Sequence, residues 1–230
     1  MRDSLAWLGK REKTFWMWLA LVAMALWLFM AIAVEVVAGD GFMLDERILL
    51  SMRTADNLAV TVGPAWLQQV AQDITALGGN AVLSLVSIWV MLFLCLINKG
   101  RLALVVLLAT GGALLASLLL KSGFDRPRPD LVQHATMVYT SSFPSSHSML
   151  AASAYLTMGA LLAQSQSRRR VKALIIISSV LLTLLIGISR IYLGVHWPTD
   201  VVAGWAAGAV WAVSCFFLAR QFTRRTHAND

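Results

Sequence analysis

Long apolar runs separated by short polar links dominate this chain. A helix rises about 1.5 Å per residue, so about 20 apolar residues cross the roughly 30 Å of hydrocarbon in a bilayer. Six segments meet or approach that length, and each predicts a transmembrane helix: Phe15–Val34, Ala81–Asn98, Leu102–Leu120, Met149–Ala163, Ala173–Ile188 and Val201–Ala219. The fourth is short, and we extend it back to about Ser145. The pattern predicts an all-α membrane protein, a six-helix bundle forming one domain over residues 1–230.

The link Gly39–Asn80, between the first two predicted spans, is long enough to hold structure of its own. Its apolar residues recur at helical spacing behind Pro64, namely Trp66, Leu67, Val70, Ile74 and Leu77. This pattern suits an amphipathic helix that lies in the membrane interface. A small lid packed on the bundle fits the same residues equally well, so the pattern leaves both interpretations open.

Composition agrees with a chain whose solvent is mostly lipid. Mean hydropathy is +0.71, and only 13% of the residues are charged. The formal charge of +7 does not indicate a nucleic-acid partner, because the cations lie in links between apolar runs and not on a soluble domain. Cys95 and Cys215 lie inside apolar runs and form neither a disulfide framework nor a metal-ligand spacing. The first run is too long for the core of a cleavable signal peptide, so none is expected.

The positive charges of the links are unevenly distributed. With a cytoplasmic N-terminus, the inside segments hold 13 of the 19 basic residues, as the positive-inside rule expects: Arg2, Lys10, Arg11, Lys13, Lys99, Arg101, Arg168, Arg169, Arg170, Lys172, Arg220, Arg224 and Arg225. The outside keeps Arg47, Arg53, Lys121, Arg126, Arg128 and Arg190. Four of these six lie in only two loops, which the rule prefers to be poor in cations. The exception indicates that these loops bind something.

Three segments at the outer ends of the third to sixth predicted spans carry the polar chemistry. They read KSGFDRPRPD (121–130), FPSSHS (143–148) and SRIYLGVHWPTD (189–200). Arginine offers phosphate oxygens a planar fork of donors, and lysine adds a point charge. Backbone N–H groups at the start of the fourth helix, near Ser145 and Ser146, add an anion site. This combination suits phosphoryl transfer without a metal.

Two histidines, His147 and His196, can divide the work of such a transfer. One attacks phosphorus and forms a phosphohistidine, and the other donates a proton to the leaving oxygen. Asp200 follows His196 by four residues, so its carboxylate could fix the ring tautomer if the backbone is helical there. Pro198 indicates a helix that starts only near Trp197, which would make the contact a capping one. His147 is the proton donor by elimination.

The order of these motifs resembles the type 2 phosphatidic acid phosphatase superfamily. The matching residues are Lys121, Arg128 and Pro129, then Pro144, Ser145 and His147, then Ser189, Arg190, His196 and Asp200. The resemblance covers about residues 121–200 at the level of motifs. It implies that His196 is the nucleophile, that Asp200 orients it and that His147 is the general acid.

The same resemblance implies a phosphate site that needs no metal or other cofactor. Its ligands would be Lys121, Arg128, Ser145, Ser146 and Arg190. One residue departs from the family pattern, because Ser146 stands where glycine is usual. Its backbone N–H can still donate, while its Cβ narrows the approach to the phosphate.

Several residues near these motifs are predicted to have no catalytic role. Arg126 is interpreted as a lipid-headgroup anchor, and His134 and His227 as solvated loop residues. Gly204 and Gly208, four residues apart in the last span, predict close helix packing.

The leading functional prediction is hydrolysis of a lipid phosphate or diphosphate at the outer face of a bacterial cytoplasmic membrane, with both termini cytoplasmic. The resemblance suggests undecaprenyl diphosphate first, and phosphatidylglycerol phosphate, phosphatidic acid or a lipid A phosphate as further candidates. A phosphotransferase that passes the group to another lipid, such as lipid A, would use the same intermediate. A non-catalytic anion-binding or transport protein is the third alternative, although no pair of broken helices at the bilayer midplane supports transport. The sequence does not indicate an oligomeric state.

Overall fold

The computed structural model describes residues 2–39, 43–130 and 141–226, and these residues are overwhelmingly helical. The helices are α1 (Arg2–Ala38), α2 (Met43–Ser51), α3 (Ala65–Ala76), α4 (Asn80–Leu96), α5 (Gly100–Leu107), a π-helical turn (Leu108–Gly112), α6 (Ala113–Ser122), α7 (Ser146–Gln164), α8 (Arg169–Tyr192) and α9 (Pro198–Thr226). The described residues form no β-strand, only an isolated bridge between Arg53 and Thr61. The predicted all-α class is therefore confirmed. His134 and His227 lie outside the described residues.

Four helical stretches are long and apolar enough to cross a bilayer: Phe15–Ala38, Gly100–Ser122, Arg169–Tyr192 and Pro198–Phe222. They correspond to the first, third, fifth and sixth predicted spans. The second predicted span is α4, which with α3 forms a pair bent by 48° that makes a fifth candidate when counted as one span. The chain is thus a multi-pass membrane protein with four or five candidate spans, and the sixth remains a prediction.

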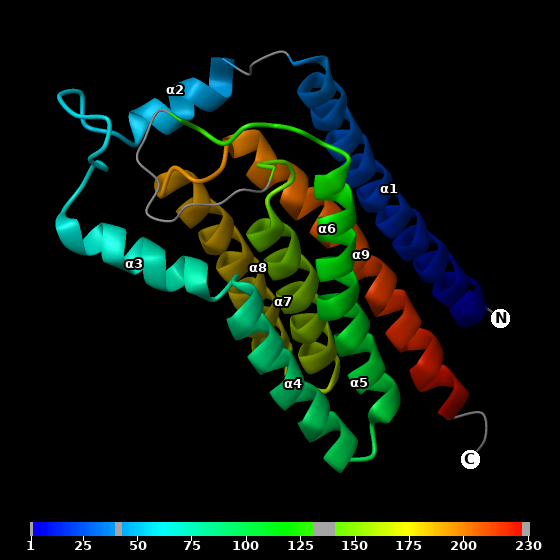
Figure 1. Ribbon diagram of the computed structural model, residues 1–230. Helices are drawn as coiled ribbons and strands as arrows, with labels where there is room; N and C mark the ends of the chain where they lie inside the picture. Colours follow the sequence, from blue (N-terminus) through cyan, green and yellow to red (C-terminus); the bar gives the residue numbers. More distant parts are fainter. Residues whose placement is uncertain (1, 40–42, 131–140, 227–230) are drawn as a thin grey trace.

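The remaining predicted span, α7, lies at the centre of the bundle, between α8, α9, α4 and α6 (Figure 1). Most of its first turns are buried, including the polar residues Ser148 and Ser153. Ser153 Oγ donates a hydrogen bond of 2.6 Å to the Ala109 carbonyl in the π-helical turn. A helix whose first turns are buried in protein can carry hydroxyl groups there that a lipid-facing helix cannot. This burial explains why α7 is not among the four stretches that are apolar enough to cross a bilayer.

Two glycines bring α9 close to α7. A Cβ on Gly204 would lie 2.6 Å from the Ser145 carbonyl oxygen, and one on Gly208 would lie closer still to that of Met149. Neither contact leaves room for a side chain, so the predicted close packing is confirmed. This close packing holds α9 against the start of α7, where Ser145 is the N-cap residue of the FPSSHS segment.

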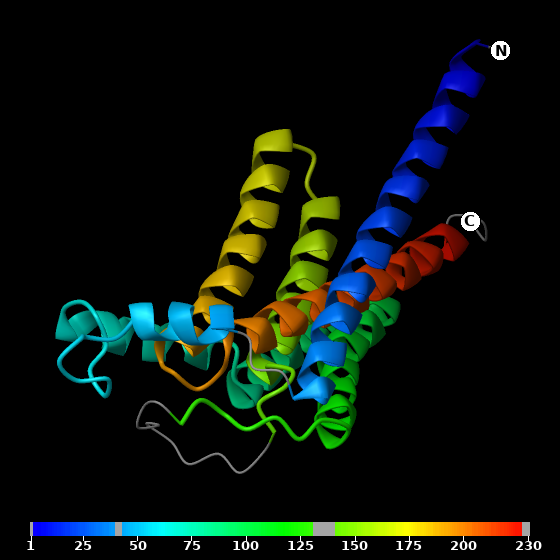
Figure 2. The same cartoon turned by 90° about the horizontal axis from the view of Figure 1, so that it is seen from above.

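The helices α2 and α3 lie across one end of the bundle, as the two views show (Figures 1 and 2). The predicted helix behind Pro64 is present as α3, and it packs against α8. Trp66 is exposed, while Ala71 is buried. A position in the membrane interface remains a prediction for α3. The starts of α7 and α9 lie at this same end of the bundle, and α1 begins and α9 ends toward the other (Figure 1).

Candidate active site

The predicted site residues come together at the end of the bundle that α2 and α3 cross. Lys121 lies in the last turn of α6, Arg190 in the last turn of α8, and Arg128 in the loop after α6. The charges of Lys121, Arg128, Arg190 and His196 all act on the imidazole of His147. Residues spread over 75 positions of the sequence, from Lys121 to His196, therefore form one cationic cluster. The structure assembles this predicted set but does not itself assign a role to any member.

His196 and Asp200 form a buried pair at the start of α9. The Nδ1 atom of His196 lies 3.4 Å from Oδ2 of Asp200, and the two side chains are 2% and 0% exposed. Ser142 Oγ donates to the same carboxylate oxygen and lies 3.5 Å from His196 Nδ1. A carboxylate beside Nδ1 favours the tautomer with a proton there, which leaves the lone pair on Nε2.

The backbone around Asp200 shows why the four-residue spacing works. Helix α9 begins at Pro198, as proline at a first helical position favours. The carboxylate of Asp200 reaches back to accept the N–H of Trp197 at 2.9 Å. This reach is the acidic half of a capping box, which satisfies an N–H group left free by the helix. Both contacts expected from the four-residue spacing therefore occur. The Asp200 carboxylate caps the start of α9 and also lies against His196.

Burial keeps His196 neutral. Removal from water is the largest of the effects that together lower its pKa from 6.5 to about 3, and the charges of Arg190 and Arg128 act in the same direction. The hydrogen bond and negative charge of Asp200 act in the opposite direction. At neutral pH the ring therefore has an unprotonated Nε2, the form that can attack an electrophile.

Arg128 lies directly beside that nitrogen. Its Nη1 donates to the Val195 carbonyl at 2.7 Å and is 3.4 Å from His196 Nε2. Burial lowers the pKa of Arg128, while the charge of Asp200 raises it. An anion held by this guanidinium would have its central atom close to Nε2. Lys121 Nζ approaches the same region and donates to the Ser141 carbonyl at 2.5 Å.

Ser145 and Ser146 start α7 as predicted. Ser145 is the N-cap, and its side chain accepts hydrogen bonds from Ser148. Its own N–H donates to the Asp200 carbonyl at 3.0 Å, which ties α7 to α9. The Ser146 hydroxyl accepts a hydrogen bond of 2.8 Å from Ser117 on α6. The side chain that replaces the family glycine is therefore turned toward α6 and held there.

The elbow between α3 and α4 forms the wall beside His147. A Cβ on Gly78 would lie 3.5 Å from Cδ2 of His147, and one on Gly79 would lie 3.8 Å from its Nε2. Thr75 accepts a hydrogen bond of 3.0 Å from Arg190 Nη1. Among the described residues, the buried Nε of Arg190 has no hydrogen-bond partner, so one donor of its fork can serve an anion.

Arg126 corrects one prediction. Instead of facing lipid headgroups, its guanidinium bridges two buried carboxylates, with Nη1 2.6 Å from Asp200 Oδ1 and Nη2 2.8 Å from Asp45 Oδ2. Arg126 also donates to Thr199 Oγ1 at 2.8 Å and lies over the Trp197 ring. The physical reason is charge, because two carboxylates that are 2% exposed or less need a cation between them.

Three contributors to the site were missed from the sequence. Ser142 bonds Asp200, Asp45 on α2 bonds Arg126, and Thr75 on α3 bonds Arg190. Ser142 directly precedes the FPSSHS segment, so its position was a usable signal. Asp45 and Thr75 lie in the link between the first two predicted spans. The hydrophobic pattern of that link predicts a helix, but it does not indicate which of its polar residues point toward the site.

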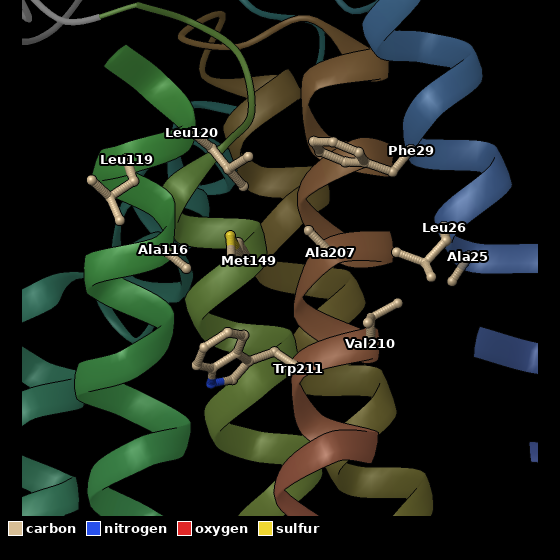
Figure 3. A pocket seen from close by; sticks show the side chains of 10 residues that line it. All are labelled: Ala25, Leu26, Phe29, Ala116, Leu119, Leu120, Met149, Ala207, Val210 and Trp211. Carbon is tan, nitrogen blue, oxygen red and sulfur yellow. The ribbon is translucent and has the colours of Figure 1, made fainter. Parts of the chain in front are cut away.

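An apolar cavity of about 430 Å³ opens beside the cluster, between α1, α6, α7 and α9 (Figure 3). Its lining residues are all apolar: Ala25, Leu26, Phe29, Ala116, Leu119, Leu120, Met149, Ala207, Val210 and Trp211. Leu120 directly precedes Lys121, and Met149 lies two residues after His147. The cavity thus lies between helices of which two, α6 and α7, also carry members of the polar cluster.

Known proteins resemble this chain in sequence and in fold. The family model described as the PAP2 superfamily matches residues 101–224. Phosphatidylglycerophosphatase B from Bacillus subtilis (strain 168) is 34% identical over 170 residues, which cover 73% of this chain and 80% of that protein. An undecaprenyl-diphosphatase from Sulfolobus acidocaldarius is 38% identical over 68 residues, 30% of this chain and 29% of that protein. A crystal structure of a transmembrane PAP2 type phosphatidylglycerolphosphate phosphatase from Bacillus subtilis superposes with a TM-score of 0.72 at 29% identity, covering 87% of this chain and 96% of that one.

Proposed function

Because this chain belongs to the PAP2 superfamily, we propose that it hydrolyses a phosphate monoester or diphosphate on a membrane lipid, through a phosphohistidine at His196. The observation that carries the proposal is the position of His196 Nε2 beside Arg128, inside a cluster of cations at one end of an apolar bundle. The two named relatives act on lipid phosphates by their names, and the motifs that match the family coincide with this cluster.

In the first step, Nε2 of His196 attacks phosphorus while the bond from phosphorus to the leaving oxygen breaks. The phosphoryl oxygens lie against Arg128, Lys121, Arg190 and the N–H groups that start α7 at Ser146. Positive charge that develops on the imidazole is stabilised by Asp200, which stays ionised. Fixed donors of this kind stabilise the transferring group without having to reorganise.

His147 supplies the proton that the leaving oxygen needs. In the second step water attacks the phosphohistidine, and His147 takes a proton from that water, so inorganic phosphate leaves and both rings return to their starting forms. The elbow at Gly78 and Gly79 keeps the ring of His147 within the pocket.

The substrate's hydrocarbon chain occupies the apolar cavity shown in Figure 3. Leu120 lines the cavity and directly precedes Lys121, which supports a lipid that presents its phosphate to the cations while its chain stays out of water. The bundle is oriented with both termini in the cytoplasm and the site on the outer face of a bacterial cytoplasmic membrane. The support is the Lys/Arg distribution of the links.

A phosphate-release panel on the purified chain in detergent tests the proposal. We expect at least one of phosphatidylglycerol phosphate, undecaprenyl diphosphate and phosphatidic acid to be hydrolysed with a kcat/KM at least about a hundredfold above that of glycerol 3-phosphate, because the soluble ester lacks chain contacts. Equal rates on glycerol 3-phosphate would contradict the lipid substrate class. Label recovered on an acceptor lipid, and not as free phosphate, would show a phosphotransferase.

Metal chelation is expected to leave phosphate release unchanged. The proposed mechanism uses cationic side chains where other phosphatases use metal ions. Among the described residues, no three His, Cys, Asp or Glu side chains group as metal ligands. The measurement is release before and after dialysis against EDTA, with add-back of Mg²⁺, Mn²⁺ or Zn²⁺. Loss on dialysis with recovery on add-back would refute the metal-free mechanism.

A further inference from the structure

A second, larger cavity lies at the opposite end of the bundle from His196. Its volume is about 640 Å³, and it separates α7 and α8 from α1 and α9. Those two pairs of helices diverge toward this end, as the view in Figure 2 shows. Lys172 at the start of α8 lines the cavity, and Arg190 of the catalytic cluster lies 18 residues further along the same helix, or about 27 Å along its axis.

The lining of this cavity is polar at one end only. Among the described residues that line it, Gln164 and Lys172 are the only ones with polar or charged side chains apart from the indole of Trp18, and none is acidic. Gln164 ends α7 and Lys172 lies in the first turn of α8, so both stand at the same level. Everything beyond them toward the centre of the bundle is apolar.

The facing wall carries an aromatic pair and a second cation. Trp18 on α1 and Phe216 on α9 lie with ring centroids 6.0 Å apart, and both line the cavity. The guanidinium of Arg220 lies 5.8 Å from the centre of the Phe216 ring. The cations at this end of the cavity are thus Lys172, which lines it, and Arg220, which lies over the Phe216 ring of the lining.

From this arrangement we infer that the cavity is a binding site for one anionic glycerophospholipid, with its headgroup between Lys172 and Arg220 and an acyl chain in the groove below. Cationic clefts between transmembrane helices hold acidic headgroups. A second copy of this chain is a poor occupant, because it would bring the same cations to the same mouth. The lining comes from three stretches apolar enough to span a bilayer, and from α7, so the groove faces lipid.

The cations of this site lie outside the catalytic cluster, although Ala25 and Val210 line both cavities, and its test does not depend on the proposed function. The purified full chain is equilibrated in mixed micelles that hold equal amounts of phosphatidylglycerol and phosphatidylcholine with matched chains. Retained lipid is then counted by native mass spectrometry. We expect one tightly retained phosphatidylglycerol, preferred about tenfold or more over phosphatidylcholine.

Three substitutions locate the bound lipid. Lys172→Gln and Arg220→Gln should each lower phosphatidylglycerol retention about fivefold, which is the usual contribution of one cation near an anionic headgroup. Ala160→Phe, which places a ring in the groove, should lower retention of both lipids. Arg169→Gln is the matched control, because Arg169 is an exposed cation at the same end that does not line the cavity, whereas Arg220 lies over the lining residue Phe216. The control should change nothing.

The outcomes distinguish a lipid in this cavity from diffuse charge attraction and from a lipid in the catalytic cluster. Equal retention of the two lipids by the unmodified chain would overturn the proposal, as would an equal loss in Arg169→Gln, which would indicate diffuse attraction to charge. A His196→Ala variant that loses the retained phosphatidylglycerol would overturn it too, by locating the lipid in the catalytic cluster. If Ala160→Phe does not fold, retention by Lys172→Gln and Arg220→Gln still tests whether the lipid binds in this cavity.

Discussion

Replacing His196 with alanine is expected to lower phosphate release at least about a thousandfold while the protein stays folded. The reason is that a lost nucleophile removes the covalent route and leaves only binding and fixed charges. The side chain is 2% exposed, so its removal leaves a small buried cavity. Release is measured on the lipid substrate and on p-nitrophenyl phosphate, with the melting temperature in detergent as the measure of folding.

The comparison with His147→Asn separates the two histidines. A general acid contributes about 10²- to 10⁴-fold, and mostly when the leaving group is a poor one. The His147→Asn variant should therefore lose release from the alkyl phosphate of a lipid but keep much of it with p-nitrophenyl phosphate, whose leaving group needs no proton. His196→Ala should fail on both. Strong release by His196→Ala, or equal losses on both substrates for His147→Asn, would contradict the assigned roles.

Replacing Arg126 with alanine should both destabilise the protein and impair turnover. The change leaves Asp45 and Asp200 as buried carboxylates without their shared cation, which costs about 3 kcal/mol or more. Asp200 would also lose one of the contacts that hold it against His196. The expected result is a lower melting temperature and a lower kcat on the same lipid substrate.

Two matched variants show which contact of Arg126 matters. Asp45→Asn removes the ion pair to α2 and the oxygen that accepts from the Thr199 hydroxyl, but it keeps an oxygen that can accept from the Thr199 N–H, so most turnover should remain. Arg126→Lys keeps the charge but not the fork that reaches both carboxylates, and it should be intermediate. If Asp45→Asn lost as much turnover as Arg126→Ala, the role of Arg126 would be to hold α2 and not to position Asp200.

The fold was predictable where lipid is the solvent. Apolar runs of about 20 residues identify helices directly, because an unpaired backbone in hydrocarbon is too costly for any other arrangement of a single segment. The hydropathy rule did not determine the number of spans, because α7 is not apolar enough to count as one. The first turns of that helix are buried in protein, where the hydroxyl group of Ser153 bonds to the Ala109 carbonyl between α5 and α6. No hydropathy pattern contains such a partner.

The polar cluster was predictable for a different reason. Cations in loops that topology prefers to be neutral, and two histidines in short motifs, predict a phosphate site from the sequence alone. The four-residue spacing of His196 and Asp200 works because Pro198 starts α9 and the carboxylate caps it. Local sequence determines all of these features.

The sequence by itself therefore determined the helices, the family resemblance and the set of predicted catalytic and phosphate-binding residues. Only the tertiary structure decided what surrounds them. Whether Arg126 meets lipid headgroups or Asp45 depends on where α2 lies, 81 residues away in the chain. Whether a cavity opens beside Lys121 or Lys172 depends on how pairs of helices diverge. These are long-range packing outcomes, and a pattern read along one segment holds no information about which distant segment will face it.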